Sequence, residues 1–254
     1  MSKILALWAV PRSTSTAFEW MMRQRGDFTC LHEPYGEAWY QGDEPLWPRL
    51  QADSVRTPGL TLAGVHARLQ QLAGEGPVFS KDFPLYIDHM WDEGLFELFN
   101  HSFLIRDPAK TIASMHKHWP DFHIKETGFK EQRELFDIIT ERRGGTPPPV
   151  IDSDDVLADP HGVVRAWCEA VGIPFIESAL SWEPGPRDEV SWWDGGSFHE
   201  LLRNSDGLKP QPRRDAKPVS EMPERVQQVY AEVLPHYQHL YQHRLQPVTA
   251  DAPA

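Results

Sequence analysis

The sequence predicts an α/β protein that forms a single doubly wound domain, with a central parallel sheet and helices on both faces. Several apolar runs of strand length are continuous rather than alternating, which is typical of strands buried on both faces of a parallel sheet. Segments with helical periodicity stand between these runs, as in repeated strand–helix units. Hydroxyl or charged residues directly follow several of the runs, at the place where open parallel sheets bind their ligands.

The length and composition fit one globular unit. The chain has 254 residues, of which 40% are hydrophobic, so it can bury a substantial core. We expect residues 1–245 to form the domain and residues 246–254 to form a flexible tail. The two cysteines give no disulfide framework, no apolar run approaches the roughly 18–20 residues of a membrane span, and the N-terminus lacks a signal-peptide pattern. These features predict a cytoplasmic protein with no membrane partner, and leave its oligomeric state open.

The net charge of −12 restricts the possible partners. An acidic chain is disfavoured as a nonspecific ligand of nucleic acid or of an anionic membrane. We therefore expect no nucleic-acid partner. An anionic small molecule would need a local pocket of Arg, Lys and backbone N–H groups.

The first strand is predicted over residues 4–10, and the first helix over residues 13–23 with Gly26 as its C-cap. The loop between them reads Pro11-Arg12-Ser13-Thr14-Ser15-Thr16. A strand, a polar turn and a helix start form the layout of a phosphate-binding loop, because backbone N–H groups and the helix dipole attract anions there. The hydroxyls and the Arg12 guanidinium add donors for phosphate oxygens.

Two observations limit what this loop indicates. It is not a Walker A motif, because neither Gly nor Lys occurs between Ala6 and Arg25. Taken alone, it is equally consistent with a cluster of N-cap residues on a buried helix.

A second strand is predicted over residues 28–31, and His32 and Glu33 follow it directly. Their position after a strand makes both residues candidates for acid–base chemistry, with ordinary loop residues as the alternative. Residues 36–63 are rich in Gly, Pro and aromatic residues, and we expect an irregular, partly buried segment that could cover a substrate.

The third strand is predicted over residues 77–82, between helices over residues 62–72 and 85–99. Lys81 near the end of this strand could face the same edge of the sheet as Arg12, or it could be a solvated residue.

A fourth strand ends in Arg106, and Asp107 and Pro108 are favourable at the N-cap and N1 of the helix that follows, which extends to near Trp119. Ser114 lies two turns into this helix, about 9 Å along its axis. Arg106 and Ser114 could bind one phosphate together, or Arg106 could pair with an acid.

The C-terminal half continues with further units. Helices are predicted over residues 128–143 and 160–171, a strand over 150–151, and a final helix over 220–245 that is interrupted at Pro235. Two clusters are each possible metal sites, but helix N-terminal charge and a polar helix face are favoured, and no metal is expected. The clusters are Asp152, Asp154 and Asp155, and His236, His239 and His243. The irregular residues 181–218 carry a basic set that could close over an anion or form a positive surface: Arg203, Lys209, Arg213, Arg214 and Lys217.

Taken together, the Pro11–Thr16 loop and the stretch from Ile105 to Ser114 resemble the two nucleotide-binding signatures of the sulfotransferase family, whose members use 3′-phosphoadenosine 5′-phosphosulfate (PAPS). The separation between Arg106 and Ser114 fits the second signature, and residues 150–174 look like the family's downstream segment. The resemblance covers about residues 4–245, and is strongest to a bacterial branch with Pro-Arg-x-x-Ser-Thr-Ala in the loop.

The resemblance implies a PAPS-dependent transferase with a P-loop-like fold, acting on a hydroxyl or amine of a small molecule. Ser13, Thr14, Ser15 and Thr16 would bind the 5′-phosphate, and Arg106 with Ser114 the 3′-phosphate. Arg12 stands where many members have a Lys that touches the bridging oxygen.

The sequence departs from the family pattern at the catalytic base. Many members have a His after the third strand in a Lys-x-His context, but here the chain reads Lys81-Asp82-Phe83. Some bacterial members use a Glu after the second strand, so Glu33 is the first candidate for the general base and His32 the second. The alternatives are a small-molecule kinase, and a nucleotide-binding relative that has lost transfer activity.

Overall fold

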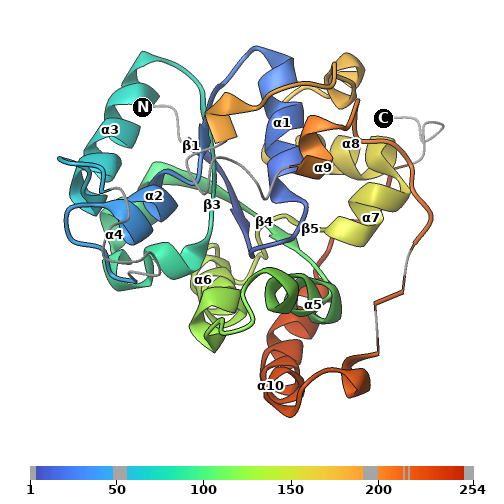
Figure 1. Cartoon of the computed structure of the whole chain (residues 1–254). Coiled ribbons are helices and arrows are strands. Elements are labelled where there is room, and N and C mark those ends of the chain that lie inside the picture. The colour runs from blue at the N-terminus through green and yellow to red at the C-terminus, as the bar shows by residue number, and fades with distance from the viewer. Residues whose placement is uncertain (1–3, 48–55, 191–199, 214, 217, 249–254) are drawn as a thin grey trace.

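The computed structural model of this chain describes residues 4–47, 56–190, 200–213, 215–216 and 218–248. Five strands form one sheet in the order β2-β3-β1-β4-β5, and every paired strand in it is parallel (Figure 1). The strands are β1 (Ile4–Ala9), β2 (Thr29–His32), β3 (Val78–Asp82), β4 (Phe99–Ile105) and β5 (Val150–Asp152). The predicted α/β class with a central parallel sheet is therefore confirmed.

Helices connect the strands and cover both faces of the sheet (Figure 1). The α-helices are α1 (Ser15–Arg25), α2 (Pro34–Gln41), α3 (Leu62–Glu75), α4 (Glu93–Leu98), α5 (Pro108–His118), α6 (Phe129–Arg142), α7 (Ser153–Ala158), α8 (Pro160–Val171), α9 (Glu200–Arg203) and α10 (Glu224–Tyr241). The 3₁₀ turns are η1 (Pro84–Tyr86), η2 (Asp88–Met90), η3 (Ile124–Thr127), η4 (Glu177–Leu180), η5 (Asp188–Val190) and η7 (Val219–Glu221).

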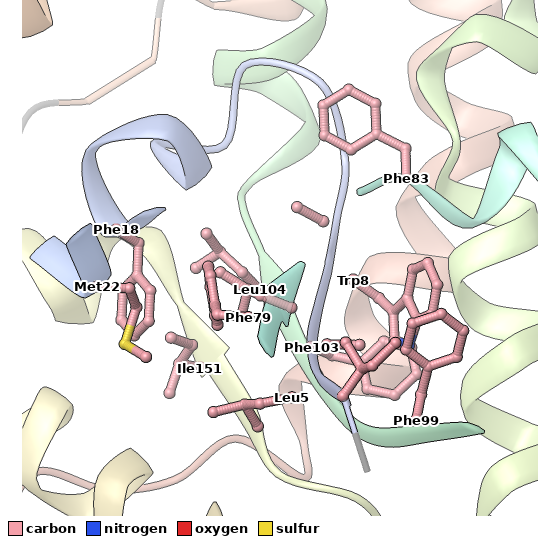
Figure 2. Packing of buried hydrophobic residues seen from close by; sticks show 14 of the residues in the cluster. Leu5, Trp8, Phe18, Met22, Phe79, Phe83, Phe99, Phe103, Leu104 and Ile151 are labelled. Atoms are coloured by element: carbon pink, nitrogen blue, oxygen red, sulfur yellow. The ribbon is translucent and has the colours of Figure 1, made fainter. Parts of the chain in front are cut away.

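The core has two layers, one on each face of the sheet. On one face, Phe18 of α1 packs edge-to-face on Trp167 of α8 with 4.9 Å between ring centroids. On the other face, Trp8 packs on Phe99 at 5.2 Å, and Phe103 packs on Phe136 of α6 at 5.6 Å. Figure 2 shows Phe18 on one side of β1 and Trp8 and Phe99 on the other. This two-sided burial explains why β1 and β4 read as continuous apolar runs.

Three predicted segments differ from the structure. The helix predicted over residues 85–99 is wrong: the chain forms η1 and η2, and only α4 is helical. Asp92 begins α4 by accepting a hydrogen bond from the Leu95 N–H at 2.9 Å, and this N-cap marks a new start rather than a continuation.

The segment predicted to be irregular over residues 36–63 lies partly in α2, whose Trp39 is buried in the core. Residues 48–55 of that segment lie outside the described part of the chain, as do residues 191–199, Arg214 and Lys217.

The interruption predicted at Pro235 is also wrong, because α10 continues through it. Pro235 is exposed, so the carbonyl that loses its N–H donor can bind water. The buried residues Val229, Val233 and Leu240 hold the helix against the domain on its other side.

The carboxyl ends of the strands meet at one edge of the sheet. His32 at the end of β2 is in register with Lys81 of β3, and Trp8 of β1 is in register with Asp82. The chain leaves β1 toward β2 on one side and later adds β4 on the other, so the strand order reverses at β1. Ligands of doubly wound proteins bind at such a point, outside the carboxyl ends of the strands.

Candidate active site

The loop between β1 and α1 has an unusual backbone. Arg12 and Thr14 have φ angles of 63° and 69°, and in the described part of the chain the only other non-glycine residue with positive φ is Glu33, at 44°. Such conformations cost about 1–3 kcal/mol each for residues other than glycine, and they gather at functional sites. All three residues line the same cavity.

The loop conformation suits an anion better than a simple helix cap. Left-handed residues that alternate with others turn successive N–H groups into a concave anion-binding nest. Thr14 is the N-cap of α1 but makes no side-chain capping hydrogen bond, and the Ser13 hydroxyl donates to the Val10 carbonyl at 2.6 Å. The alternative that the loop hydroxyls serve as helix caps therefore does not hold for Thr14, whose hydroxyl caps no N–H group of α1.

A cavity of about 560 Å³ opens at this edge of the sheet. Most of the site residues predicted from the sequence line it: Arg12, Ser13, Thr14, Ser15, Thr16, His32, Glu33 and Arg106. Ser114 is not among the lining residues. Its hydroxyl accepts a hydrogen bond from Arg12 Nε at 3.0 Å, so Ser114 orients Arg12.

Arg106 and Arg12 form a pair of half-buried cations. Arg106 Nη1 donates to the Arg12 carbonyl at 2.6 Å, which fixes the left-handed loop against the end of β4. Burial lowers the pKa of both guanidinium groups, and for Arg12 the charge of Arg106 lowers the pKa further. Arginine nonetheless stays protonated in proteins. These two partly desolvated cations, one in the loop after β1 and one after β4, make a local anion site in a chain of net charge −12.

Further basic residues surround this pair. Lys110 and Arg213 also line the cavity, where Lys110 Nζ lies 2.5 Å from Asp154 and Arg213 contacts Asp155. The sequence marked Arg213 as part of a basic set but gave no role to Lys110. Of the same set, Lys209 pairs with Asp206 at 2.5 Å on the surface.

A buried charged cluster lies beside Arg12. Lys81 is 0% exposed and contacts Glu33 Oε1, and its Nζ lies 3.9 Å from Glu19 Oε2. Glu19 Oε2 lies 2.6 Å from His32 Nδ1, and His32 Nε2 lies 3.9 Å from Glu33 Oε1. A buried ammonium needs carboxylate partners of this kind. The alternative that Lys81 is a solvated residue is therefore wrong.

Asp82, next to Lys81 in β3, binds backbone N–H groups. Its carboxylate accepts hydrogen bonds from the N–H groups of Tyr35 at 2.9 Å and Phe83 at 3.0 Å, which fixes the start of α2 beside β3. Burial, followed by the charge of Glu33, raises its pKa well above the ordinary value. We assign Asp82 a structural role on these contacts.

Aromatic side chains form another wall of the cavity. Tyr40, Phe83, Tyr86 and Trp119 line it, and the Tyr86 ring packs on Phe83 with 5.3 Å between centroids. The Tyr86 hydroxyl points to Glu33 Oε2 at 3.5 Å. The cavity thus combines a basic end with an aromatic wall, and Glu33 belongs to both.

The two clusters considered as metal sites have other roles. Asp152 Oδ1 accepts from the Asp154 N–H at 2.8 Å as the N-cap of α7, and Asp155 binds Arg244 Nε at 2.9 Å. His239 binds Asp137 at 2.8 Å on the helix surface. Within the described ranges, no three His, Cys, Asp or Glu side chains group as a metal site. In the same ranges, no helix has the length and apolar character needed to cross a membrane.

The buried Glu19 gives a prediction about acid stability. Burial alone would raise the pKa of Glu19, but the charge and hydrogen bond of His32, with Lys81 and Arg23, outweigh it and lower this pKa from 4.5 to about 2. A lowered pKa in the folded state stabilises the protein above pH 4.5, and this contribution disappears as the pH falls toward 2. The contribution is on the order of 3 kcal/mol.

The free energy of unfolding, measured by chemical denaturation between pH 6 and pH 2, reports this contribution. The two limits bracket the titration of Glu19. We expect Glu19→Gln to flatten the acid limb of the stability curve. Glu131→Gln removes another buried carboxylate, outside this cluster, and should leave the Glu19 contribution in place. An unchanged acid limb in Glu19→Gln would show that Glu19 titrates normally in the folded protein.

Comparison with known proteins places the chain in a family. A family model described as a sulfotransferase domain matches residues 2–238. Two curated proteins of Arabidopsis thaliana, branched-chain-amino-acid aminotransferase-like proteins 2 and 1, are each 28% identical to it, over 218 and 247 residues. These alignments cover 82% and 93% of the chain, which spans only 37% and 42% of the two relatives.

Among solved structures, the chain is similar to the sulfotransferase domain from the Synechococcus PCC 7002 olefin synthase. The TM-score is 0.52 at 17% identity, and the match covers 92% of this chain and 94% of that one. This likeness supports the fold, and the family match over nearly the whole length is the stronger finding. The chain belongs to the sulfotransferase family.

Proposed function

We propose that this protein is a PAPS-dependent sulfotransferase that transfers a sulfuryl group to a hydroxyl or amine of a small molecule. One observation carries the proposal: Arg12 and Arg106, joined by a hydrogen bond of 2.6 Å, face one cavity beside a left-handed loop without Gly or Lys. A donor with phosphates at both its 5′ and 3′ positions needs two cationic contacts of this kind. PAPS supplies the activated sulfuryl group.

On the donor side, the backbone N–H groups and hydroxyls of residues 13–16 would bind the 5′-phosphate, and Arg106 the 3′-phosphate. Arg12 would stabilise the negative charge that builds on the leaving phosphate. Ser114 supports this role indirectly, because its hydroxyl accepts a hydrogen bond from Arg12 Nε and so orients the guanidinium.

On the acceptor side, Glu33 would remove the proton of the acceptor hydroxyl as its oxygen attacks sulfur in line. The contact with the buried Lys81 ammonium holds the Glu33 carboxylate in place at the cavity. The aromatic wall of Tyr40, Phe83 and Tyr86 offers an apolar surface for the body of the acceptor.

Calorimetric titration with the product 3′-phosphoadenosine 5′-phosphate (PAP) tests the donor site. We expect Arg106→Ala to weaken PAP binding by about 10- to 100-fold, because it removes charge-assisted hydrogen bonds worth about 1.5–3 kcal/mol. Arg133→Ala is the control, since Arg133 on α6 pairs with Asp137 within the same helix.

Two outcomes would contradict the proposal. One is a protein whose Arg106→Ala variant binds PAP as tightly as the parent. The other is magnesium-dependent ATP turnover, which would indicate a kinase.

A further inference from the structure

Glu19 is a fully buried carboxylate on α1 that the mechanism above does not use. Its Oε1 accepts from Arg23 Nε at 3.0 Å and Nη2 at 2.8 Å, and its Oε2 lies 2.6 Å from His32 Nδ1. None of its side chain is exposed. A carboxylate held in this way has a fixed orientation, and it fixes the imidazole ring that it contacts.

The contact determines which nitrogen of His32 carries the proton. An ionised carboxylate can only accept hydrogen bonds, so Nδ1 must be the donor across the distance of 2.6 Å. When the ring is neutral, Nε2 is therefore unprotonated, and this nitrogen is the one that lies 3.9 Å from Glu33 Oε1. A buried carboxylate that sets the tautomer of a histidine is how proton-accepting imidazoles are held in other enzymes.

Lys81 gives a reason for the proton to leave Glu33. Once Glu33 takes a proton it becomes neutral, and the Lys81 ammonium, itself fully buried, loses the charge of its nearest partner. A buried charge without compensation is strongly destabilised. Transfer of the proton to His32 restores the Glu33 carboxylate, and the imidazolium cation is compensated by Glu19.

We propose that Glu19 is a positioning residue, which holds His32 with its proton on Nδ1 so that Nε2 receives the proton that Glu33 removes from the acceptor. This inference rests on the proposed function. In the reaction the acceptor O–H bond breaks, an O–S bond forms and the S–O bond to the leaving phosphate breaks. The proton passes from Glu33 Oε1 to His32 Nε2, and no oxidant or further reactant is needed. Catalytic hydrogen bonds are commonly long without substrate and shorten in the complex, in agreement with the distance of 3.9 Å.

The tautomer can be measured without any assay of activity. Long-range proton–nitrogen correlation spectra of the ¹⁵N-labelled protein, with His32 assigned through His32→Asn, report which ring nitrogen carries hydrogen. We expect the Nδ1-protonated neutral ring in the parent and in the control Glu131→Gln, and a mixture of tautomers in Glu19→Gln. An Nε2-protonated ring in the parent, or a ring that stays doubly protonated at the pH of the assay, overturns the proposal.

Kinetics then separate positioning from binding. We expect Glu19→Gln and His32→Asn to lower kcat by about 10²-fold, the lower end of general acid–base effects, with PAP affinity and the acceptor KM unchanged. His32→Asn keeps a donor toward Glu19 but has no Nε2. This variant therefore tests the proton transfer to His32 even if Glu19→Gln does not fold. A parental kcat in His32→Asn overturns the relay.

The two proposals fail in different ways. A parent protein that binds PAP and transfers no sulfuryl group to any acceptor contradicts the proposed function. A protein that transfers sulfuryl groups but has the wrong His32 tautomer contradicts only the role of Glu19.

Discussion

Arg12→Ala is expected to lower kcat for sulfuryl transfer by about 10²- to 10³-fold, the loss that follows removal of one donor from a site of developing charge. Arg12 is held in the left-handed region with φ 63°, its Nε by Ser114 and its carbonyl by Arg106. A guanidinium fixed in this way loses no rotamer freedom when charge builds on the leaving phosphate. Single-turnover rates at saturating PAPS measure the effect.

The matched variants show whether charge or geometry matters. Arg12→Lys keeps the charge and should retain part of the rate, because many family members have Lys at this position. Ser114→Ala removes the acceptor of Arg12 Nε and should cause a smaller loss in the same direction. If Arg12→Ala raises the PAPS KM and leaves kcat intact, Arg12 binds the ground state equally well and the proposed role is wrong.

Glu33→Gln is expected to lower kcat by about 10²- to 10⁴-fold, since the amide cannot take the acceptor proton. PAP affinity should be unchanged, because Glu33 follows β2 and the donor contacts come from β1 and β4. The transfer rate and a calorimetric PAP titration on the same variant measure the two quantities.

The variant also disturbs Lys81, so a stability control is needed. Glu33→Gln removes the nearest carboxylate from the buried ammonium, which keeps Glu19 at 3.9 Å, and should destabilise the fold. The double variant Glu33→Gln/Lys81→Met should regain stability but not activity. A double variant that recovers transfer, or a single variant with the parental kcat, would show that Glu33 is not the base.

The fold could be predicted because burial on both faces leaves continuous apolar runs, as in β1 and β4. The loop and Arg106 could be predicted because each follows such a run directly. The segment after β3 could not, since the helical periodicity over residues 85–99 is interrupted by turns whose hydrogen bonds are local. The break predicted at Pro235 was wrong because the packing of α10 against the domain outweighs the one backbone hydrogen bond that proline removes.

The positions of the candidate site residues could be predicted in part, and their roles stay predictions. Ser114 was placed with Arg106 on spacing, but spacing does not specify which side chain a hydroxyl meets, and in the structure it meets Arg12. Glu19 gave no signal at all. With Arg23 four residues later, it has the pattern of an exposed ion pair on a helix surface. Only the structure shows that Glu19 is buried against His32 and Lys81.

The central claim is that one cavity binds two phosphate groups of a nucleotide through separate contacts, the loop and Arg106. Calorimetric titration with PAP and with 5′-AMP, which lacks only the 3′-phosphate, tests it directly. We expect the parent to bind PAP about 10- to 100-fold more tightly than 5′-AMP, and Arg106→Ala to lose this difference. Equal affinities for PAP and 5′-AMP in the parent, or a difference that survives in Arg106→Ala, would contradict the account.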